Sequence, residues 1–197
     1  MAPTGHVSRG PAVVIERAHG AVDAVSRRFG LEERGIALGG FMGTGKSTVG
    51  RLLAKRLNLD FIDLDDVLAA HFGPIADQFA KDGEEVFRAR EAGLIEALGD
   101  VKRVAVIATG GGAWVDPENR EALRQIADLV VLTAPLPVIR ARIGADPSRP
   151  LWDTKVEARW QSRQHAYADA DLTIDTSENT PEQVVEAIIQ WRLANEE

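Results

Sequence analysis

A glycine-rich segment constrains the fold of this chain more than any other feature of its sequence. Residues 40–47 read GFMGTGKS and match the pattern G-x-x-x-x-G-K-[ST] at every fixed position. An apolar run precedes the segment and a helical pattern follows it. Such a loop turns successive backbone N–H groups toward one point, where the positive end of the helix dipole favours an anion. The sequence therefore predicts a phosphate-binding loop, and the alternative is a glycine-rich turn that only caps a helix.

Short apolar runs alternate with longer helical patterns along the rest of the chain. The expected strands are residues 35–38, 61–63, 104–108, 129–133 and 172–175. This alternation predicts right-handed crossovers and a three-layer α/β/α fold, in which helices cover both faces of a five-stranded parallel sheet. Ligands of such sheets bind beyond the carboxyl ends of the strands, so the loops after these runs form the candidate site.

The beginning of the chain is expected to lie outside this domain. Residues 1–11 are rich in small and turn-forming residues and are expected to be flexible, whereas apolar residues at helical spacing predict an amphipathic helix over residues 12–29. The predicted organisation is an extension at residues 1–33 and one α/β domain at residues 34–197.

Charge and composition exclude several classes of function. The 197 residues carry a formal net charge of −7, which argues against nucleic acid as the main partner. No apolar run approaches the roughly 18 to 20 residues of a membrane span, and the first residues lack the apolar stretch of a signal peptide. The absence of cysteine agrees with a reducing compartment. We therefore expect a soluble cytoplasmic protein, and a monomer.

Two side chains of the phosphate loop have roles predicted by their chemistry. Lys46 is expected to span the β- and γ-phosphates of a nucleotide, and the Ser47 hydroxyl is expected to ligate a Mg²⁺ ion that bridges the same phosphates. The loop thus indicates an enzyme that transfers a phosphoryl group from ATP.

Three acidic residues in four positions follow the second expected strand. They are Asp63, Asp65 and Asp66, and their mutual repulsion would be relieved by a divalent metal. A carboxylate at this edge of the sheet could also orient or deprotonate an attacking hydroxyl. The alternative is helix capping, which we favour for Asp66, whereas metal or acceptor binding is the preferred interpretation of Asp63 and Asp65.

Several separated motifs, from about residue 36 to the end of the chain, resemble those of the shikimate kinase family. After the phosphate loop come D-x-D at 63–65, F-R-x-x-E at 87–91 and G-G-G at 110–112. R-P-L at 149–151 and a late R-x-x-x-Y at 163–167 follow. The order and the spacing of these motifs agree with the family, whose fold is similar to that of the nucleoside monophosphate kinases.

The resemblance implies transfer of the γ-phosphoryl group of ATP to the 3-hydroxyl of shikimate, a step of aromatic amino acid biosynthesis, with Mg²⁺ as cofactor. By that similarity Asp63 joins Ser47 in assisting Mg²⁺. Asp65 holds the shikimate hydroxyls and acts as the base, while Lys46 serves catalysis as well as ATP binding.

The resemblance also implies roles for four arginines and for several small residues. Arg88 and Arg163 would grip the substrate carboxylate, Arg142 would lie against adenine, and Arg149 would close over the phosphates as part of a lid. The remaining implied contacts to ATP are Gly43, Thr44, Gly45 and Thr48, and those to the substrate are Gly111 and Gly112.

The chemistry of arginine supports the carboxylate-binding roles independently of the resemblance. An arginine offers a planar, permanently charged fork that matches a carboxylate at two points, and Glu91 stands one helical turn after Arg88, where it could hold that fork. The alternatives are a surface ion pair for Arg88, a strand-ending loop for residues 110–112 and a solvated loop charge for Arg149.

The chain departs from the family pattern at two places. Its sequence also leaves two rival functions open. Residues 163–167 read RQHAY where the family usually has R-x-P-L-Y, and Asn179 stands near the position of an adenine-side arginine in some relatives. Nucleotide base selectivity is therefore left open. The rivals are another P-loop metabolite kinase, such as gluconate kinase, and a ligand-sensing domain without turnover.

Overall fold

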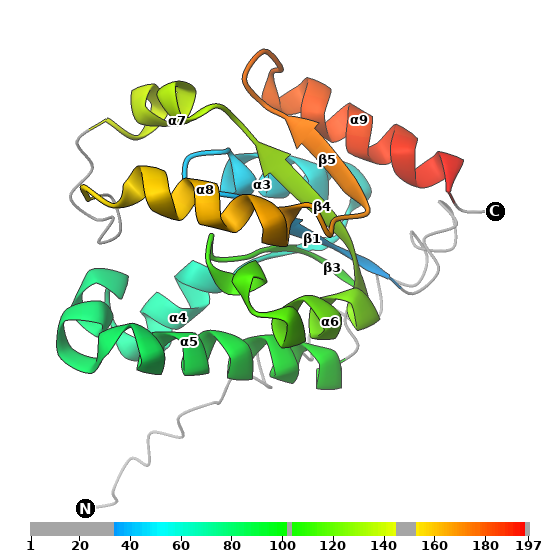
Figure 1. The fold of residues 1–197 in the computed structure, drawn as a ribbon. Helices are drawn as coiled ribbons and strands as arrows, with labels where there is room; N and C mark the ends of the chain where they lie inside the picture. The colour runs from blue at the N-terminus through cyan, green and yellow to red at the C-terminus, as the bar shows by residue number, and fades with distance from the viewer. Residues whose placement is uncertain (1–33, 102–103, 145–152, 196–197) are drawn as a thin grey trace, which may run out of the picture. The chain divides into compact units, whose positions relative to one another are not determined.

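The structure is a computed structural model that describes residues 34–101, 104–144 and 153–195 (Figure 1). The helix predicted at residues 12–29 and the lid residue Arg149 both lie outside these described residues. The described part of the chain forms one α/β domain.

Five parallel strands form one sheet in the order β2-β3-β1-β4-β5. Their bounds are Gly35–Gly39 (β1), Asp60–Asp63 (β2), Ala105–Ala108 (β3), Ala127–Thr133 (β4) and Leu172–Asp175 (β5). The predicted parallel sheet is confirmed, and each predicted run coincides with its strand to within a residue or two. Because β1 is central, the phosphate loop that follows it emerges between β3 and β4.

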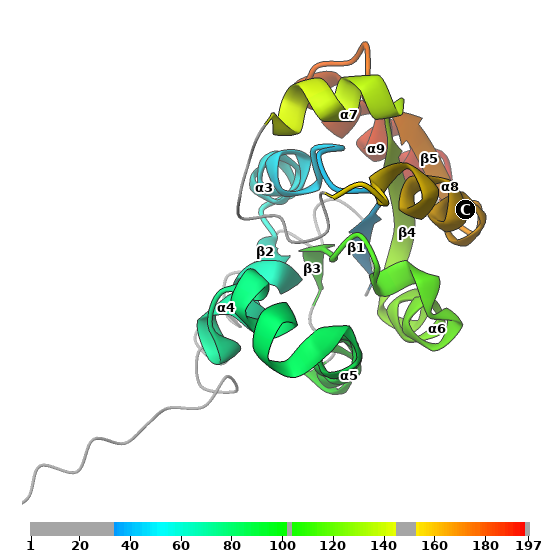
Figure 2. The same ribbon diagram turned by 60° about the vertical axis from the view of Figure 1, so that its left-hand side comes forward.

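Helices cover both faces of the sheet (Figure 2). One face carries α3 (Lys46–Leu57) and α9 (Pro181–Ala194). The other side carries α4 (Leu64–Phe72), α5 (Ile75–Val101), α6 (Pro117–Ile126) and α8 (Val156–Tyr167). The short helices η2 (Ala113–Val115) and α7 (Leu136–Ile143) complete the described domain.

The central strands supply two separate cores because successive side chains point to opposite faces. Ile36 and Leu38 pack in the core formed with α3 and α9, whereas Ala37, Leu129 and Val131 belong to the core on the opposite face. All five residues are fully buried. Burial on both faces explains why these strands read as continuous apolar runs in the sequence.

Helix α5 is interrupted at Gly83, where φ is +85° and ψ is 168°. A positive φ of this kind is readily adopted only by glycine. Across the break, the rings of Phe79 and Phe87 lie with their centroids 4.7 Å apart. The periodic pattern of the sequence does not reveal this interruption, which gives the helix a bend beside the candidate site.

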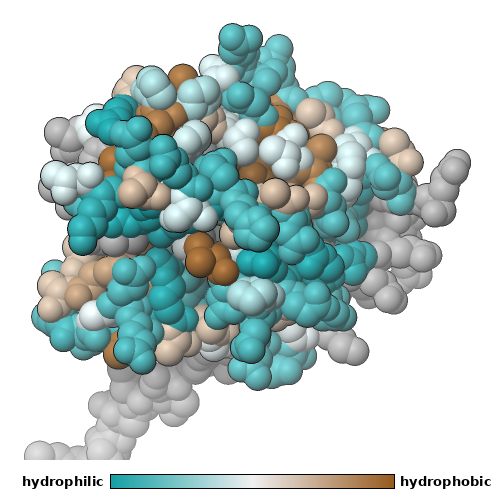
Figure 3. Space-filling view, viewed as in Figure 1, coloured by the Kyte–Doolittle hydropathy of each residue, from teal (hydrophilic) through white to brown (hydrophobic). Residues whose placement is uncertain are grey.

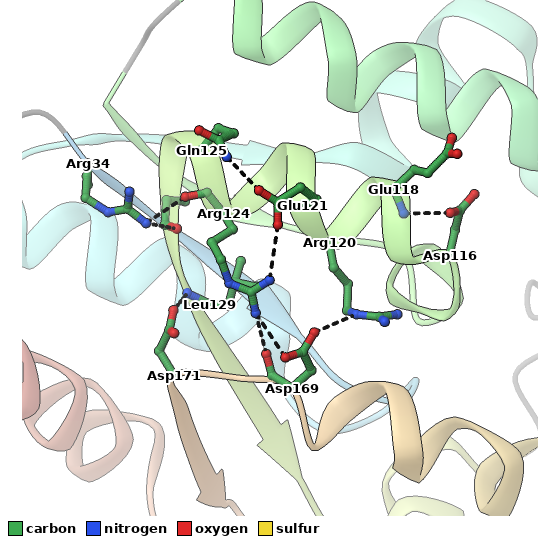
Figure 4. Close-up of polar contacts among 11 residues, drawn as sticks. Arg34, Asp116, Glu118, Arg120, Glu121, Arg124, Gln125, Leu129, Asp169 and Asp171 are labelled. Atoms are coloured by element: carbon green, nitrogen blue, oxygen red, sulfur yellow. Dashed lines mark hydrogen bonds and ion pairs between the residues drawn. The ribbon is translucent and has the colours of Figure 1, made fainter.

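Two arginines of α6 hold the segment that joins α8 to β5 (Figure 4). Arg120 Nε lies 3.1 Å from Asp169 Oδ2, and Arg124 Nη2 lies 3.2 Å from Asp169 Oδ1. Arg124 also donates a hydrogen bond to the carbonyl oxygen of Asp169. The hydrogen bond from Arg120, together with the charge of Arg124, lowers the pKa of the Asp169 carboxyl. The end of α8 is thereby fixed to α6.

Hydrophilic residues dominate the face of the molecule shown in Figure 3. Large apolar side chains that are exposed within the described ranges, namely Phe72, Val86, Val115 and Leu193, are spread over four different helices. Of the helices that the structure describes, none is long and apolar enough to cross a membrane.

Candidate active site

A cavity of about 920 Å³ opens at the carboxyl ends of the strands. Its walls come from the segments after β1, β2, β3 and β5, together with α5, α7, α8 and the start of α9. Every predicted site residue within the described ranges lines it: Gly43, Thr44, Gly45, Lys46, Ser47, Thr48, Asp63, Asp65, Arg88, Gly111, Gly112, Arg142 and Arg163. The sequence therefore identifies the residues that the fold brings together, although Arg149 lies outside the described ranges.

The phosphate loop curls around the side chain of Lys46, the first residue of α3. Its Nζ donates hydrogen bonds to the carbonyl oxygens of Gly40, at 2.8 Å, and Phe41, at 2.9 Å. These bonds hold the ammonium group at the helix N-terminus, where the helix dipole also favours an anion. Lys46 is therefore placed where a phosphate would meet both positive groups.

Ser47 and Asp63 meet across two neighbouring loops of the cavity. Ser47 Oγ donates a hydrogen bond of 2.6 Å to Asp63 Oδ2. The other carboxylate oxygen of Asp63 accepts a hydrogen bond of 3.2 Å from the backbone N–H of Asp65. The pair offers only oxygen donors, which Mg²⁺ prefers, so these residues fit that ion. Among the described residues there is no group of three or more His, Cys, Asp or Glu side chains that could hold a metal.

The prediction that Asp66 caps the following helix is wrong. Asp63 is the N-cap of α4, because β2 ends at Asp63 and the helix begins at the next residue without an intervening loop. Asp66 therefore lies inside the first turn, where its carboxylate forms an exposed ion pair with Arg51 at 3.1 Å. Asp63 thus caps the helix and contacts Ser47 at the same time.

Arg88 lies between two glutamates of its own helix. Its Nη1 donates to Glu91 Oε2 at 2.7 Å, and its Nη2 donates to Glu84 Oε1 at 3.1 Å. The Glu91 side chain is fully buried, so the alternative of a surface ion pair is wrong. Burial raises the pKa of the Glu91 carboxyl, and Arg88 opposes this effect. Although burial works to lower the pKa of Arg88, the two glutamates raise it above its usual value.

Arg163 is the second guanidinium that faces the cavity, and it is almost completely buried. Its Nη1 is buried and has no hydrogen-bond partner among the residues that the structure describes. Burial lowers the pKa of Arg163, and the positive charge of Arg88 adds to that effect. An arginine nevertheless stays charged in proteins. A buried charged N–H without a partner is costly, so an anionic ligand would stabilise this group.

The three glycines after β3 lie in contact with these charged side chains. A Cβ atom at Gly110 would overlap Glu91, and one at Gly112 would overlap the guanidinium of Arg88. The groups that approach the backbone of this loop closely are thus the side chains of Glu91 and Arg88. Larger residues at these two positions would displace the charged groups.

Arg142 is tied to the loop that follows β5. Its Nη1 donates to Thr176 Oγ1 at 2.9 Å, and its Nη2 donates to the Thr176 carbonyl oxygen at 2.5 Å. The same hydroxyl lies 3.1 Å from the carbonyl oxygen of Thr44 in the phosphate loop. Thr176, Phe79 and Phe87 line the cavity but received no role from the sequence. Thr176 directly follows β5, and this position is the feature by which the sequence could have identified it as a site residue.

Tyr167 offers a direct test of the burial of this site, because it is the only tyrosine of the chain. Burial raises its pKa from 10.0 to about 12, with Arg163 working in the opposite direction. The folded protein therefore keeps a phenolic proton that the unfolded chain releases. The free energy of unfolding should fall as the pH rises between these two values, by on the order of 2 to 3 kcal/mol.

The measurement is the ultraviolet absorbance of phenolate at about pH 11, with and without urea. The unfolded chain should be mostly ionised at that pH, and the folded protein should be mostly neutral. A folded protein whose phenol titrates at the ordinary value would contradict the described burial of Tyr167.

Comparisons with known proteins agree on one family. The protein-family model described as "Shikimate kinase" matches residues 42–192. The chain is 46% identical to the shikimate kinase of Geobacter sulfurreducens over 161 residues, which cover 79% of this chain and 88% of that protein. It is 40% identical to the shikimate kinase of Thermodesulfovibrio yellowstonii over 170 residues, which cover 82% of this chain and 98% of that protein.

Solved structures point the same way. The shikimate kinase of Acinetobacter baumannii, determined in complex with shikimate, matches with a TM-score of 0.79 at 34% identity over 86% of this chain and 98% of that one. A gluconokinase of Sinorhizobium meliloti matches with a TM-score of 0.61 at 18% identity over 82% of this chain and 94% of that one. The second likeness shows a shared fold alone.

Proposed function

The chain belongs to the shikimate kinase family, and from that membership we propose how its residues transfer the γ-phosphoryl group of ATP to the 3-hydroxyl of shikimate. One observation carries the proposal. Arg88 and Arg163 lie against the glycine loop at one part of the cavity, and the phosphate loop forms another part of the same cavity. A cavity with two guanidinium groups in one part and a phosphate loop in another suits an acceptor that carries a carboxylate.

For the nucleotide, we propose that the phosphates bind the backbone of Gly43, Thr44 and Gly45 and the side chains of Lys46, Ser47 and Thr48. All of these residues line the cavity at the N-terminus of α3. Arg142, held by Thr176, would contact the adenine side. Arg149, which lies outside the described residues, keeps the phosphate contact proposed from the sequence.

For the metal, Ser47 and Asp63 would hold Mg²⁺ beside the phosphates. Such an ion neutralises the charge that develops on the phosphates during transfer. Asp63 can serve this purpose without disturbing the helix, because one of its oxygens already caps α4 while the other faces Ser47.

For the acceptor, Arg88 and Arg163 would bind the carboxylate of shikimate, and the backbone of Gly111 and Gly112 would contact the same molecule. Asp65 would accept the proton of the 3-hydroxyl as that oxygen bonds to the γ-phosphorus. The bond from the γ-phosphorus to its bridging oxygen breaks in the same step, which gives shikimate 3-phosphate and ADP. Positioning and charge neutralisation supply most of the rate in reactions of this class.

The test is an ADP-release assay with shikimate, gluconate or no acceptor in parallel. We expect Mg²⁺-dependent ADP formation with shikimate and little with the other two. Preferential turnover of gluconate would favour the rival kinase. Shikimate binding without ADP formation would favour a sensing domain.

Thr176→Val should weaken the use of ATP and spare the acceptor. Valine keeps the shape of threonine but removes the hydroxyl that accepts a hydrogen bond from Arg142. We expect the KM for ATP to rise about threefold to tenfold, the range for one lost hydrogen bond of ordinary strength, because Arg142 keeps its bond to the Thr176 carbonyl oxygen. Steady-state kinetics with each substrate varied in turn would measure it. A rise in the KM for shikimate of the same size would argue against a nucleotide-side role.

The remaining proposals concern location and assembly. A chain with a net charge of −7 and no cysteine suits the cytoplasm, and we propose that it acts there as a monomer.

A further inference from the structure

The hydroxyl of Tyr167 contacts the glycine loop directly, although the proposed reaction assigns it no role. Tyr167 is the last residue of α8, and its side chain is almost completely buried. Its Oη donates a hydrogen bond of 2.5 Å to the carbonyl oxygen of Gly111. This bond joins the acceptor loop to a helix that is far from it in the sequence.

A hydrogen bond to the Gly111 carbonyl fixes more than one atom. The carbonyl of Gly111 and the N–H of Gly112 belong to the same planar peptide unit and point in opposite directions. Glycine residues allow this unit to rotate more freely than other residues would. The Tyr167 hydroxyl therefore sets the direction of the Gly112 N–H, which belongs to a cavity-lining residue.

Arg163 stands one helical turn before Tyr167 on α8. The positive charge of Arg163 lowers the pKa of the Tyr167 phenol and so works against the effect of burial. A Cβ atom at Gly111 would lie 3.4 Å from Arg163 Nη1. The Tyr167 hydroxyl and the Arg163 guanidinium thus both lie beside Gly111.

Arg120 of α6 binds the segments on both sides of this contact, and Figure 4 shows its bond to Asp169. Its Nη1 donates to the carbonyl oxygen of Trp114, two residues after the glycine loop, and its Nε donates to Asp169, two residues after Tyr167. The loop and the end of α8 are therefore held in register independently of the tyrosine. Loss of the hydroxyl alone should leave both segments in place and free only the peptide unit.

We propose that Tyr167 is a positioning residue for the acceptor, because its hydroxyl fixes the Gly111–Gly112 peptide unit, which lies beside the Arg163 guanidinium. This inference rests on the proposed function, in which these groups bind shikimate. It predicts a defect in acceptor binding that is separate from nucleotide binding.

Tyr167→Phe keeps the ring and removes the hydroxyl. We expect the KM for shikimate to rise about tenfold or more, with kcat changed less than about threefold and the KM for ATP unchanged within about twofold. A loss of uniform binding to the acceptor has this kinetic signature. An unchanged KM for shikimate in a folded Tyr167→Phe enzyme would overturn the proposal.

The matched control is Asn119→Leu. Asn119 is buried, and its Nδ2 donates a hydrogen bond of 3.0 Å to the carbonyl oxygen of Ala113, in the turn that follows the glycine loop. This variant loses a comparable buried bond without touching Gly111. If it raises the KM for shikimate as much as Tyr167→Phe does, the effect reflects general loosening of the turn, and the positioning role is wrong.

A second measurement does not depend on how well Tyr167→Phe folds. Because the chain has one tyrosine, biosynthetic labelling with fluorotyrosine gives a single ¹⁹F resonance, from residue 167. Shikimate alone should shift this resonance, and an ATP analogue alone should shift it much less. The inference would be overturned if the labelled enzyme phosphorylates shikimate and its ¹⁹F resonance does not shift when shikimate is added. An unlabelled parent without shikimate-dependent ADP release would instead refute the proposed function.

Discussion

Asp63→Asn should reduce kcat by about a hundredfold or more, equivalent to about 2.7 kcal/mol, while the protein keeps its fold. Asparagine caps a helix as well as aspartate does, so the hydrogen bond from the N–H of Asp65 to position 63 survives. The change removes only the negative charge beside Ser47, which the proposed Mg²⁺ site requires. Turnover measured over a Mg²⁺ titration, together with the melting temperature, would separate the two effects.

The control for this variant is Asp66→Asn. Asp66 lies in the same turn and also lines the cavity, but its carboxylate pairs with Arg51 at the surface. Removing that charge should change turnover only slightly. Near-normal turnover of Asp63→Asn with an unchanged Mg²⁺ dependence would show that Asp63 does not serve the metal.

Arg88→Lys should lower kcat/KM for shikimate by well over tenfold, or more than about 1.4 kcal/mol. Lysine keeps the charge but lacks the planar fork of N–H donors. Arg88 uses this fork to bind Glu91 and Glu84 in the described structure. We expect the loss to appear with shikimate and to be smaller with shikimate methyl ester, which lacks the anionic group.

Arg90→Lys is the matched control, because Arg90 stands on the same helix and pairs with Asp82 at 2.8 Å without lining the cavity. Its kinetics should stay close to those of the parent enzyme. If the parent enzyme uses the methyl ester as well as it uses shikimate, Arg88 does not bind a carboxylate.

The sequence predicts the strands and the cavity lining of this protein well because both depend on short patterns. A buried parallel strand must be apolar throughout, so β1 and β4 stand out as runs. The carboxyl ends of parallel strands meet at one edge, so the residues after β1, β2 and β3 were expected to converge, and they do. The roles of these residues stay predictions until the variants are measured.

Other features depend on tertiary context that the sequence does not display. The spacing of Arg88 and Glu91 predicted their contact, but the burial of Glu91 depends on the loop after β3, where Gly110 lies against its carboxylate. The cap at Asp63 depends on how closely a strand is joined to the next helix. Thr176 belongs to none of the motifs, and although it directly follows β5, its contact with Arg142 appears only in the folded structure.

The central position of β1 bears on how the protein is made. β1 is the first strand of the described domain, but its register partners include Val106 in β3 and Ala127 in β4, which are synthesised much later. Pairings between residues so distant in the chain form slowly, because a long loop must close first. A nascent chain that stops before β4 would carry the complete phosphate-loop sequence and still lack the strand on one side of it.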